Sequence, residues 1–321
     1  MSTRPSILIA RNVFPEVVAK LREHFDVDTN DEDNPLSPSQ LAERLQGKVG
    51  VITTGSERVD AALIAACPQL KIVANMAVGY NNIDVPACKA RSVLVTNTPG
   101  VLTEATADIA MSLILMVTRR LAEGERVIRA QQPWQWGMFY MLGSSIQGRQ
   151  LGIVGMGQIG AAVARRARAF GMTIAYTKRT PLDAATHKEL DAKHVELDEL
   201  LATSEVVSLH CPYSPETHHF MNATQLAKMK SSAYLINTAR GPVVDEAALA
   251  DALQRNVIAG AGLDVFEKEP TVHEGLLGLD NAVLIPHLGS ATQETRAAMA
   301  ILAASNAIAI CNDQSPPTPV N

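Results

Sequence analysis

The chain has 321 residues, of which 47% are hydrophobic and 19% charged, which is an ordinary globular composition and more chain than one hydrophobic core usually supports. The formal net charge of -5 supplies no basic surface for nucleic acid, and no apolar stretch is long enough to cross a membrane. Four cysteines without framework spacing, and an N-terminal apolar run too short for a signal peptide, predict a cytoplasmic protein with free thiols.

The first hundred residues alternate short apolar runs with amphipathic segments. Strands are expected at residues 7–10, 49–53, 71–75 and 93–97, and helices at 15–24, 39–45 and 61–66. Strands that alternate with helices predict a parallel sheet.

The segment NMAVGYNNID begins at the end of the strand expected at 71–75. Ligands bind beyond the carboxyl ends of parallel strands, and a turn of small residues such as Val78 and Gly79 can present backbone N–H groups to a carboxylate. A purely structural turn, in which Gly79 only supplies a required backbone angle, is the alternative.

A long apolar helix is expected over residues 103–120, with Thr103 as its N-cap, and it leads to a second sheet. The only two tryptophans, Trp134 and Trp136, follow in a loop-like stretch that ends at Gly148. Such aromatic residues indicate either an interface or pocket wall, or a local hydrophobic cluster.

The stretch LGIVGMGQIG at 151–160 places GxGxxG spacing between an apolar strand and a helix expected at 161–170. Gly155 allows the bend, Gly157 lets a pyrophosphate approach the main chain, and Gly160 lets the helix pack close to the strand. A second strand at 173–176 completes a βαβ unit, so we predict a dinucleotide-binding turn; a ligand-free glycine turn is the alternative.

The residues after this second strand indicate which dinucleotide binds. NAD-binding proteins carry an Asp or Glu there, whereas this chain reads TKRT over 177–180. Two cations and two hydroxyls suit a 2′-phosphate, so NADP(H) is the predicted cofactor. The alternative is that Lys178 and Arg179 are ordinary solvated charges.

Four further strands are expected at 206–209, 234–237, 262–265 and 283–285, followed by a helix over 291–310 and a tail. Strand ends that converge on a cofactor are where chemistry is expected. Arg240 in NTARG, Glu269 in DVFEKEP and His287 in PHLGS lie beyond three of these strands, although each alone could be a structural residue.

Together these stretches resemble the D-isomer-specific 2-hydroxyacid dehydrogenases over nearly the whole chain, most closely the glyoxylate/hydroxypyruvate reductase branch. The resemblance implies an α/β fold of two doubly wound parallel-sheet domains. A Rossmann cofactor domain, residues 101–288, is inserted in a flavodoxin-like substrate domain, residues 1–100 and 289–321, and the active site lies in the cleft. It also implies a homodimer.

The same resemblance implies that Arg240 binds the substrate carboxylate and carbonyl, that His287 donates a proton, and that Glu269 is its partner. The amides of Val78 and Gly79 hold the carboxylate, with Ser290 nearby. Trp136 aligns with a tryptophan that reaches into the substrate pocket of the other subunit. The predicted cofactor contacts are Thr106, Gly155, Gly157, Gln158, Ile159, Lys178, Arg179, Thr180, Cys211, Pro212, Thr217, Thr238, Ala239, Arg240, Asp264, His287 and Gly289.

The chemistry agrees with these roles. Hydride arriving at a 2-keto carbon leaves negative charge on oxygen, which a guanidinium can stabilise and an imidazolium can neutralise by proton transfer. The cofactor supplies the hydride, so no metal is expected. We predict NADPH-dependent reduction of glyoxylate to glycolate and of hydroxypyruvate to D-glycerate; the alternatives are a reductase of a larger 2-keto acid such as 2-ketogluconate, or a nucleotide-sensing binding protein.

Overall fold

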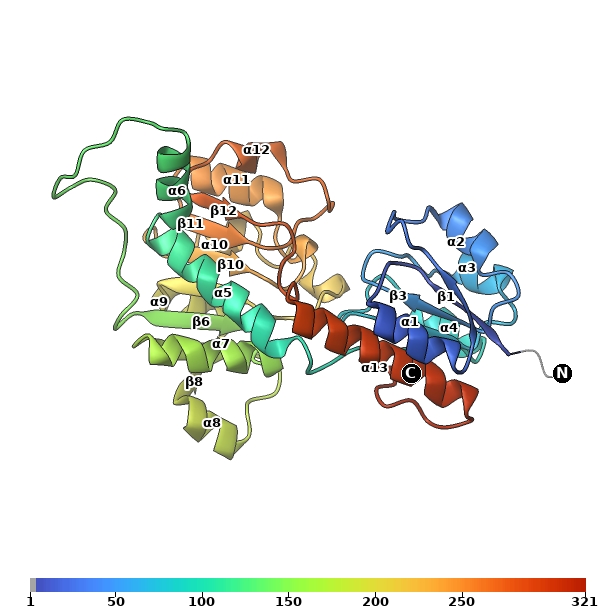
Figure 1. The fold of residues 1–321 in the computed structure, drawn as a ribbon. Helices are drawn as coiled ribbons and strands as arrows, with labels where there is room; N and C mark the ends of the chain where they lie inside the picture. The colour runs from blue at the N-terminus through green and yellow to red at the C-terminus, as the bar shows by residue number, and fades with distance from the viewer. Residues whose placement is uncertain (1–3) are drawn as a thin grey trace. The chain divides into compact units, whose positions relative to one another are not determined.

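The structure, a computed structural model, describes residues 4–321 and divides the chain into two compact units. Unit 1 contains the residues up to Leu102 together with Thr292–Asn321, and unit 2 contains Thr103–Ala291 (Figure 1). Each unit is a parallel sheet with helices on both faces. The assignment of unit 1 to the substrate and of unit 2 to the cofactor stays a prediction.

Unit 1 contains a five-stranded sheet in the order β2-β1-β3-β4-β5, which is the order of flavodoxin-like sheets. The strands are β1 (Ser6–Ile9), β2 (Asp26–Thr29), β3 (Gly50–Thr53), β4 (Ile72–Asn75) and β5 (Leu94–Thr96). The helices are α1 (Pro15–Arg22), α2 (Pro38–Arg44), α3 (Ala61–Ala66), α4 (Val85–Ala90) and α13 (Gln293–Cys311).

Alternating side chains of this sheet pack into two apolar clusters, because successive residues of a strand point to opposite faces. Leu8 packs on the face covered by α2, α3 and α4, whereas Ile7 and Ile9 pack on the face covered by α1 and α13. The expected tail is tied to the edge of the sheet: the Thr318 hydroxyl donates to the Asn97 carbonyl at 2.6 Å.

Unit 2 contains a seven-stranded sheet in the order β12-β11-β10-β9-β6-β7-β8. This is the Rossmann order with one further strand, and β6 is its first strand. The strands are β6 (Gln150–Val154), β7 (Thr173–Thr177), β8 (Ala192–His194), β9 (Val206–Leu209), β10 (Tyr234–Asn237), β11 (Gly260–Leu263) and β12 (Ala282–Leu284). The expected combination of a Rossmann sheet with a flavodoxin-like sheet is confirmed.

Helices cover both faces of the second sheet. They are α5 (Thr103–Thr118), α6 (Leu121–Arg129), α7 (Gln158–Ala169), α8 (Ala184–Leu190), α9 (Leu197–Thr203), α10 (Ala223–Leu226), α11 (Glu246–Gln254) and α12 (Glu274–Leu277), with short 3-10 turns η1 (Pro215–Thr217) and η2 (Gly241–Val243). Helices α5 and α7 lie side by side on one face, whereas α9 and α11 pack on the other (Figure 1). Across residues 4–321, every helix is too short or too polar to cross a lipid bilayer.

Two expected elements need correction. The helix expected over 103–120 ends at Thr118, because Arg120 has a left-handed φ of 55°, and α6 then begins at Leu121. The strand expected over 262–265 is β11, two residues earlier. Gly260 contributes no side chain to the apolar pattern, and it must be small because a Cβ there would lie 2.7 Å from the carbonyl oxygen of Asn281.

Candidate functional site

The turn between β6 and α7 has the geometry that a dinucleotide-binding turn needs. Gly155 has a φ of 93°, and a Cβ there would lie 2.5 Å from the backbone nitrogen of Cys211. A Cβ at Gly160 would lie 2.6 Å from the Gly155 carbonyl oxygen, whereas one at Gly157 would meet no atom of the described chain within 4 Å. The fold therefore requires the first and third glycines, and the second leaves open space for a pyrophosphate.

The first two residues of α7, Gln158 and Ile159, carry N–H groups that have no carbonyl partner within the helix. These groups, at the positive end of the helix dipole, suit an anion placed in the open space at Gly157. The turn thus holds both features that were expected of it, a tight bend and a helix N-terminus open to a ligand.

The loop after β9 lies against this glycine turn through Cys211. Burial raises the pKa of the Cys211 thiol to about 11, so it stays protonated and acts as an apolar contact. Thr217 holds the loop together, because its hydroxyl donates to the Pro212 carbonyl at 2.8 Å and accepts from the Ser214 N–H at 2.7 Å.

Beyond β7, Lys178 is half-buried, whereas Arg179 and Thr180 are exposed. A hydrogen bond from Ser214 and, more weakly, the charge of Arg179 lower the pKa of Glu216. Arg179 therefore lies within electrostatic reach of η1, the short turn in the loop that follows β9. The arrangement leaves a cation and a hydroxyl exposed at the end of the second Rossmann strand.

Arg240, Glu269 and His287 follow β10, β11 and β12, which are neighbouring strands of the sheet. His287 Nδ1 lies 2.8 Å from Glu269 Oε2, and the Phe266 N–H donates to Glu269 Oε1 at 3.0 Å. The His287 side chain is 48% exposed, so one edge of the ring is held while the other is open. A ring held at Nδ1 can exchange a proton with a ligand at Nε2.

The charges of these residues reinforce one another. Burial raises the pKa of Glu269, but the hydrogen bond and charge of His287, with smaller contributions from the Phe266 N–H and the Arg240 charge, outweigh burial and lower it overall. Burial lowers the pKa of Arg240, and Glu269 opposes this change. A guanidinium stays protonated at any pH at which proteins fold, so Arg240 is a permanent cation at this site.

Two predicted cofactor residues, Asp264 and Thr106, hold the His287 loop through hydrogen bonds to its backbone. The Asp264 carboxylate accepts the N–H groups of Leu288 and Gly289, the latter at 2.8 Å, and burial raises its pKa. The Asp264 carbonyl accepts the His287 N–H at 2.9 Å. The Thr106 hydroxyl donates to the Gly289 carbonyl at 3.1 Å. These bonds hold His287 in a left-handed backbone with a φ of 50°, which a non-glycine residue adopts only when its surroundings impose it.

Thr238, Ala239 and the partly exposed His210 lie where β9 and β10 end. His210 Nε2 lies 2.8 Å from Ser208 Oγ, and His210 Nδ1 lies 3.4 Å from Thr238 Oγ1. Burial lowers the pKa of His210 to about 4, so the ring is neutral near pH 7. The Ala239 N–H is taken by the side chain of Asn237 at 3.0 Å. Sequence reasoning did not identify this contact, which no local motif indicates.

In unit 1, three carbonyls of the turn after β4 accept hydrogen bonds. Asn97 Nδ2 donates to the Val78 carbonyl at 2.9 Å, and Asn75 Nδ2 donates to the Gly79 carbonyl at 3.0 Å. The Ala77 carbonyl accepts a backbone N–H at 3.0 Å. Because a trans peptide points its N–H opposite to its C=O, the N–H groups of Val78 and Gly79 face away from these donors. That these two N–H groups bind a carboxylate stays a prediction.

Ser290, the remaining predicted substrate contact, is half-buried in unit 2, next to Gly289.

Trp136 lies apart from these strand ends, in the loop that joins α6 to β6. Figure 1 shows this segment as an extended loop that leaves the body of unit 2. Its exposed apolar side chains include Trp134, Trp136, Met138, Phe139 and Leu142. Such a run of exposed apolar residues is typical of a protein interface.

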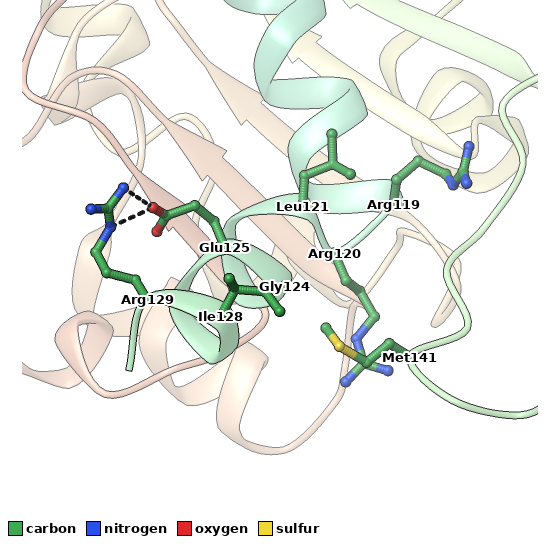
Figure 2. A pocket seen from close by; sticks show the side chains of 8 residues that line it. All are labelled: Arg119, Arg120, Leu121, Gly124, Glu125, Ile128, Arg129 and Met141. Atoms are coloured by element: carbon green, nitrogen blue, oxygen red, sulfur yellow. Dashed lines mark hydrogen bonds and ion pairs between the residues drawn. The ribbon is translucent and has the colours of Figure 1, made fainter. Parts of the chain in front are cut away.

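A hollow of about 670 Å³ lies between α6 and this loop (Figure 2). Leu121, Ile128 and Met141 contribute apolar surface, and Arg129 pairs with Glu125 at 2.6 Å on its rim. The hollow contains none of the residues at the ends of β10, β11 and β12, so it is not where His287 and Glu269 lie. Over residues 4–321, no three His, Cys, Asp or Glu side chains are grouped to hold a metal ion.

Comparison with known proteins gives a consistent result. Residues 111–289 match the family described as D-isomer specific 2-hydroxyacid dehydrogenase, NAD binding domain. A glyoxylate reductase of Thermococcus onnurineus is 47% identical over 323 residues, covering 99% of this chain and 96% of that protein.

Solved structures agree. An NADPH-dependent glyoxylate/hydroxypyruvate reductase from Sinorhizobium meliloti, in complex with NADP and malonate, is 38% identical with a TM-score of 0.89, covering 99% of this chain and 97% of that one. A glyoxylate reductase from Paecilomyes thermophila is 33% identical with a TM-score of 0.90, covering 100% and 99%.

Proposed function

Because this chain belongs to the D-isomer-specific 2-hydroxyacid dehydrogenase family, we propose that it catalyses the NADPH-dependent reduction of glyoxylate to glycolate and of hydroxypyruvate to D-glycerate. The observation that carries the proposal is the 2.8 Å contact between His287 and Glu269, in the same unit as Arg240 and the glycine turn. The names of the relatives in Thermococcus and Sinorhizobium support this choice of substrates and cofactor.

When bound, the reduced nicotinamide supplies a hydride to the 2-keto carbon. Arg240 stabilises the negative charge that develops on the keto oxygen, and His287 gives that oxygen a proton from Nε2. Glu269 fixes the orientation of the imidazole through its contact with Nδ1. The N–H groups of Val78 and Gly79 bind the substrate carboxylate, so that unit 1 holds the substrate and unit 2 the cofactor.

The preference for NADPH is the part of the proposal that depends on Lys178, Arg179 and Thr180. Arg179 and Thr180 are exposed beyond β7, and a guanidinium is the group best suited to a phosphate. The family description mentions NAD, so the choice between the two cofactors needs a direct measurement. Ratios of kcat/KM for NADPH and NADH provide it; a preference for NADH would overturn this part alone.

We also propose that the protein works as a cytoplasmic homodimer. The exposed apolar loop and the adjoining hollow support a second copy as the partner, with Trp136 entering the substrate pocket of the other subunit. Sedimentation velocity should give twice the chain mass, and Trp136→Ala should raise the KM for glyoxylate more than that for NADPH. A monomer with full activity would remove this part of the proposal.

The proposal as a whole is tested by following NADPH oxidation with a panel of 2-keto acids. We expect glyoxylate and hydroxypyruvate to give the highest kcat/KM. A higher value for 2-ketogluconate would favour a larger substrate, because the same catalytic residues serve both and only the pocket discriminates. Binding of NADPH without turnover of any keto acid would instead favour a nucleotide-sensing protein.

A further inference from the structure

Two glutamates outside the proposed catalytic three bind one another's backbone. Glu246, the first residue of α11, is only 4% exposed, and Glu267 lies two residues before Glu269. The Glu246 N–H donates to Glu267 Oε1 at 2.8 Å, and the Glu267 N–H donates to Glu246 Oε1 at 2.6 Å. Each carboxylate thus holds the main chain of the other residue, and we refer to this pair as the carboxylate clamp.

The remaining oxygens of the clamp are also engaged. Glu246 Oε2 accepts the His273 N–H at 3.2 Å, and Glu267 Oε2 lies 3.2 Å from His219 Nε2. All four carboxylate oxygens therefore have partners, which makes the clamp a complete polar network of the kind that rigidifies a buried region.

The clamp joins the two loops that carry Arg240 and Glu269. Next to Arg240, a Cβ built on Gly241 would lie 1.8 Å from the carbonyl carbon of Phe266, so the two backbones are in direct contact there. The Phe266 N–H in turn binds Glu269. The Arg240 loop is therefore held at Gly241 and at Glu246, and the Glu269 loop is held at the consecutive residues Phe266 and Glu267. Glu246 also holds the far end of the Glu269 loop, at the His273 N–H.

We propose that Glu246 and Glu267 are positioning residues for the reduction. By fixing the Glu269 loop against the Arg240 loop, the clamp holds the Glu269 carboxylate at the distance from His287 that proton donation needs. The inference rests on the proposed function. Its physical basis is that displacement of a catalytic group by about 1 Å can cost on the order of a hundredfold in rate.

The test compares Glu267→Ala with Glu267→Gln in steady-state assays of glyoxylate reduction. Glu267→Ala should lower kcat by about tenfold to a hundredfold while leaving the KM for NADPH unchanged, because the glycine turn lies elsewhere. Glu267→Gln should recover most of the loss, since its amide oxygen can still accept the Glu246 N–H. Lys268→Ala, an exposed neighbour in the same loop, is the matched control and should behave as wild type.

A double-mutant cycle with Glu269→Gln separates positioning from general stability. If the clamp acts through Glu269, Glu267→Ala should lower kcat little further once Glu269→Gln is present. Additive losses, or a folded Glu267→Ala variant with wild-type kcat, would overturn the proposal. If Glu267→Ala does not fold by circular dichroism, Glu246→Gln takes its place. Its amide nitrogen cannot accept a second N–H, so it loses the bond to either Glu267 or His273, and a smaller loss of kcat, again non-additive with Glu269→Gln, is expected.

If the wild type turns over no keto acid, the proposed function is refuted. The positioning proposal can still be tested in that case. Amide hydrogen exchange then reports on the clamp directly. Exchange at Glu246 and Phe266 should be faster in Glu267→Ala than in Lys268→Ala, and equal rates in the two variants would refute the clamp.

Discussion

Two turns in this molecule are proposed to bind anions, and they are built in different ways. The turn after β6 depends on missing side chains: Gly155 has a φ of 93° and packs against Cys211. The turn after β4 depends on side chains that are present, because the side-chain amides of Asn75 and Asn97 donate hydrogen bonds to its carbonyls. The glycine turn therefore carries a recognisable sequence motif, whereas the turn after β4 is supported by residues that no motif identifies.

The two turns also differ in how strongly a single substitution should affect them. A methyl group added at Gly155 or Gly160 meets backbone that cannot move away, so the fold itself is at risk. Removing the side-chain amide of Asn75 or Asn97 leaves one carbonyl of the turn after β4 without that hydrogen bond, and the rest of the chain stays intact. We expect the largest effects from changes in the glycine turn and the smallest from changes in the turn after β4.

Gly155→Ala should have the largest effect. The new Cβ would lie 2.5 Å from the Cys211 nitrogen, at a φ that L-residues rarely adopt, so the free energy of unfolding should fall by about 3 kcal/mol or more. Gly157→Ala, whose Cβ meets no described atom, should keep its stability but bind NADPH about tenfold more weakly or worse. Urea unfolding and fluorescence titration measure both; equal stability of the two variants would contradict this distinction.

His210 makes the stability of the glycine-turn region depend on pH, because its backbone packs against that turn: a Cβ on Gly155 would lie 2.7 Å from the His210 carbonyl carbon. Its pKa is lowered to about 4, whereas an unfolded histidine titrates near 6.5, so below pH 6.5 the unfolded chain binds a proton that the folded chain refuses. Stability should therefore fall as pH drops from 6.5 toward 4, by about 2 kcal/mol at pH 5 from this group.

His210→Asn removes this contribution and keeps a polar side chain. Its free energy of unfolding, measured by urea titration at pH 7 and pH 5, should change less than that of the wild type. An unchanged difference between the two pH values would show that His210 titrates normally in the folded protein.

Arg179→Ala tests the proposed binding of the NADPH 2′-phosphate beyond β7. Loss of a charge-assisted hydrogen bond to a 2′-phosphate should reduce the ratio of kcat/KM for NADPH over NADH by about tenfold to a hundredfold. Lys188→Ala, on exposed α8, is the control for a general loss of positive charge. If Arg179→Ala keeps the wild-type ratio, Arg179 is an ordinary surface charge.

Asn97→Ala should have the smallest effect, because one hydrogen bond to the Val78 carbonyl is lost. The freed peptide can rotate, so the KM for glyoxylate should rise by about tenfold while the KM for NADPH stays constant. Initial rates at varied glyoxylate and fixed NADPH measure this. A rise in both constants, or in neither, would argue against a carboxylate nest after β4.

Sequence reasoning predicted most elements of both sheets, since apolar periodicity and glycine spacing are local signals. It missed the edge strands β2 and β8, because they are short, and β2 reads DVDT with little apolar pattern. It misplaced β11, where Gly260 and Gly262 are small for packing reasons that appear only in three dimensions.

The candidate site was predictable in part. Glu269 and His287 were identified as partners only through family resemblance, and their contact depends on β11 and β12 being neighbours in the sheet. The clamp joins Glu246 and Glu267, and the turn after β4 joins Asn97 to Val78; both contacts cross about 20 residues of sequence. Long-range hydrogen bonds of this kind leave no periodic signal to find.

The most direct test is single-turnover oxidation of bound NADPH by glyoxylate in wild type and His287→Ala. If His287 supplies the proton, the rate should fall by about a hundredfold to ten-thousandfold, while NADPH binds with wild-type affinity. A His287→Ala variant that oxidises NADPH at close to the wild-type rate across the pH range would contradict the assignment of His287 as the acid.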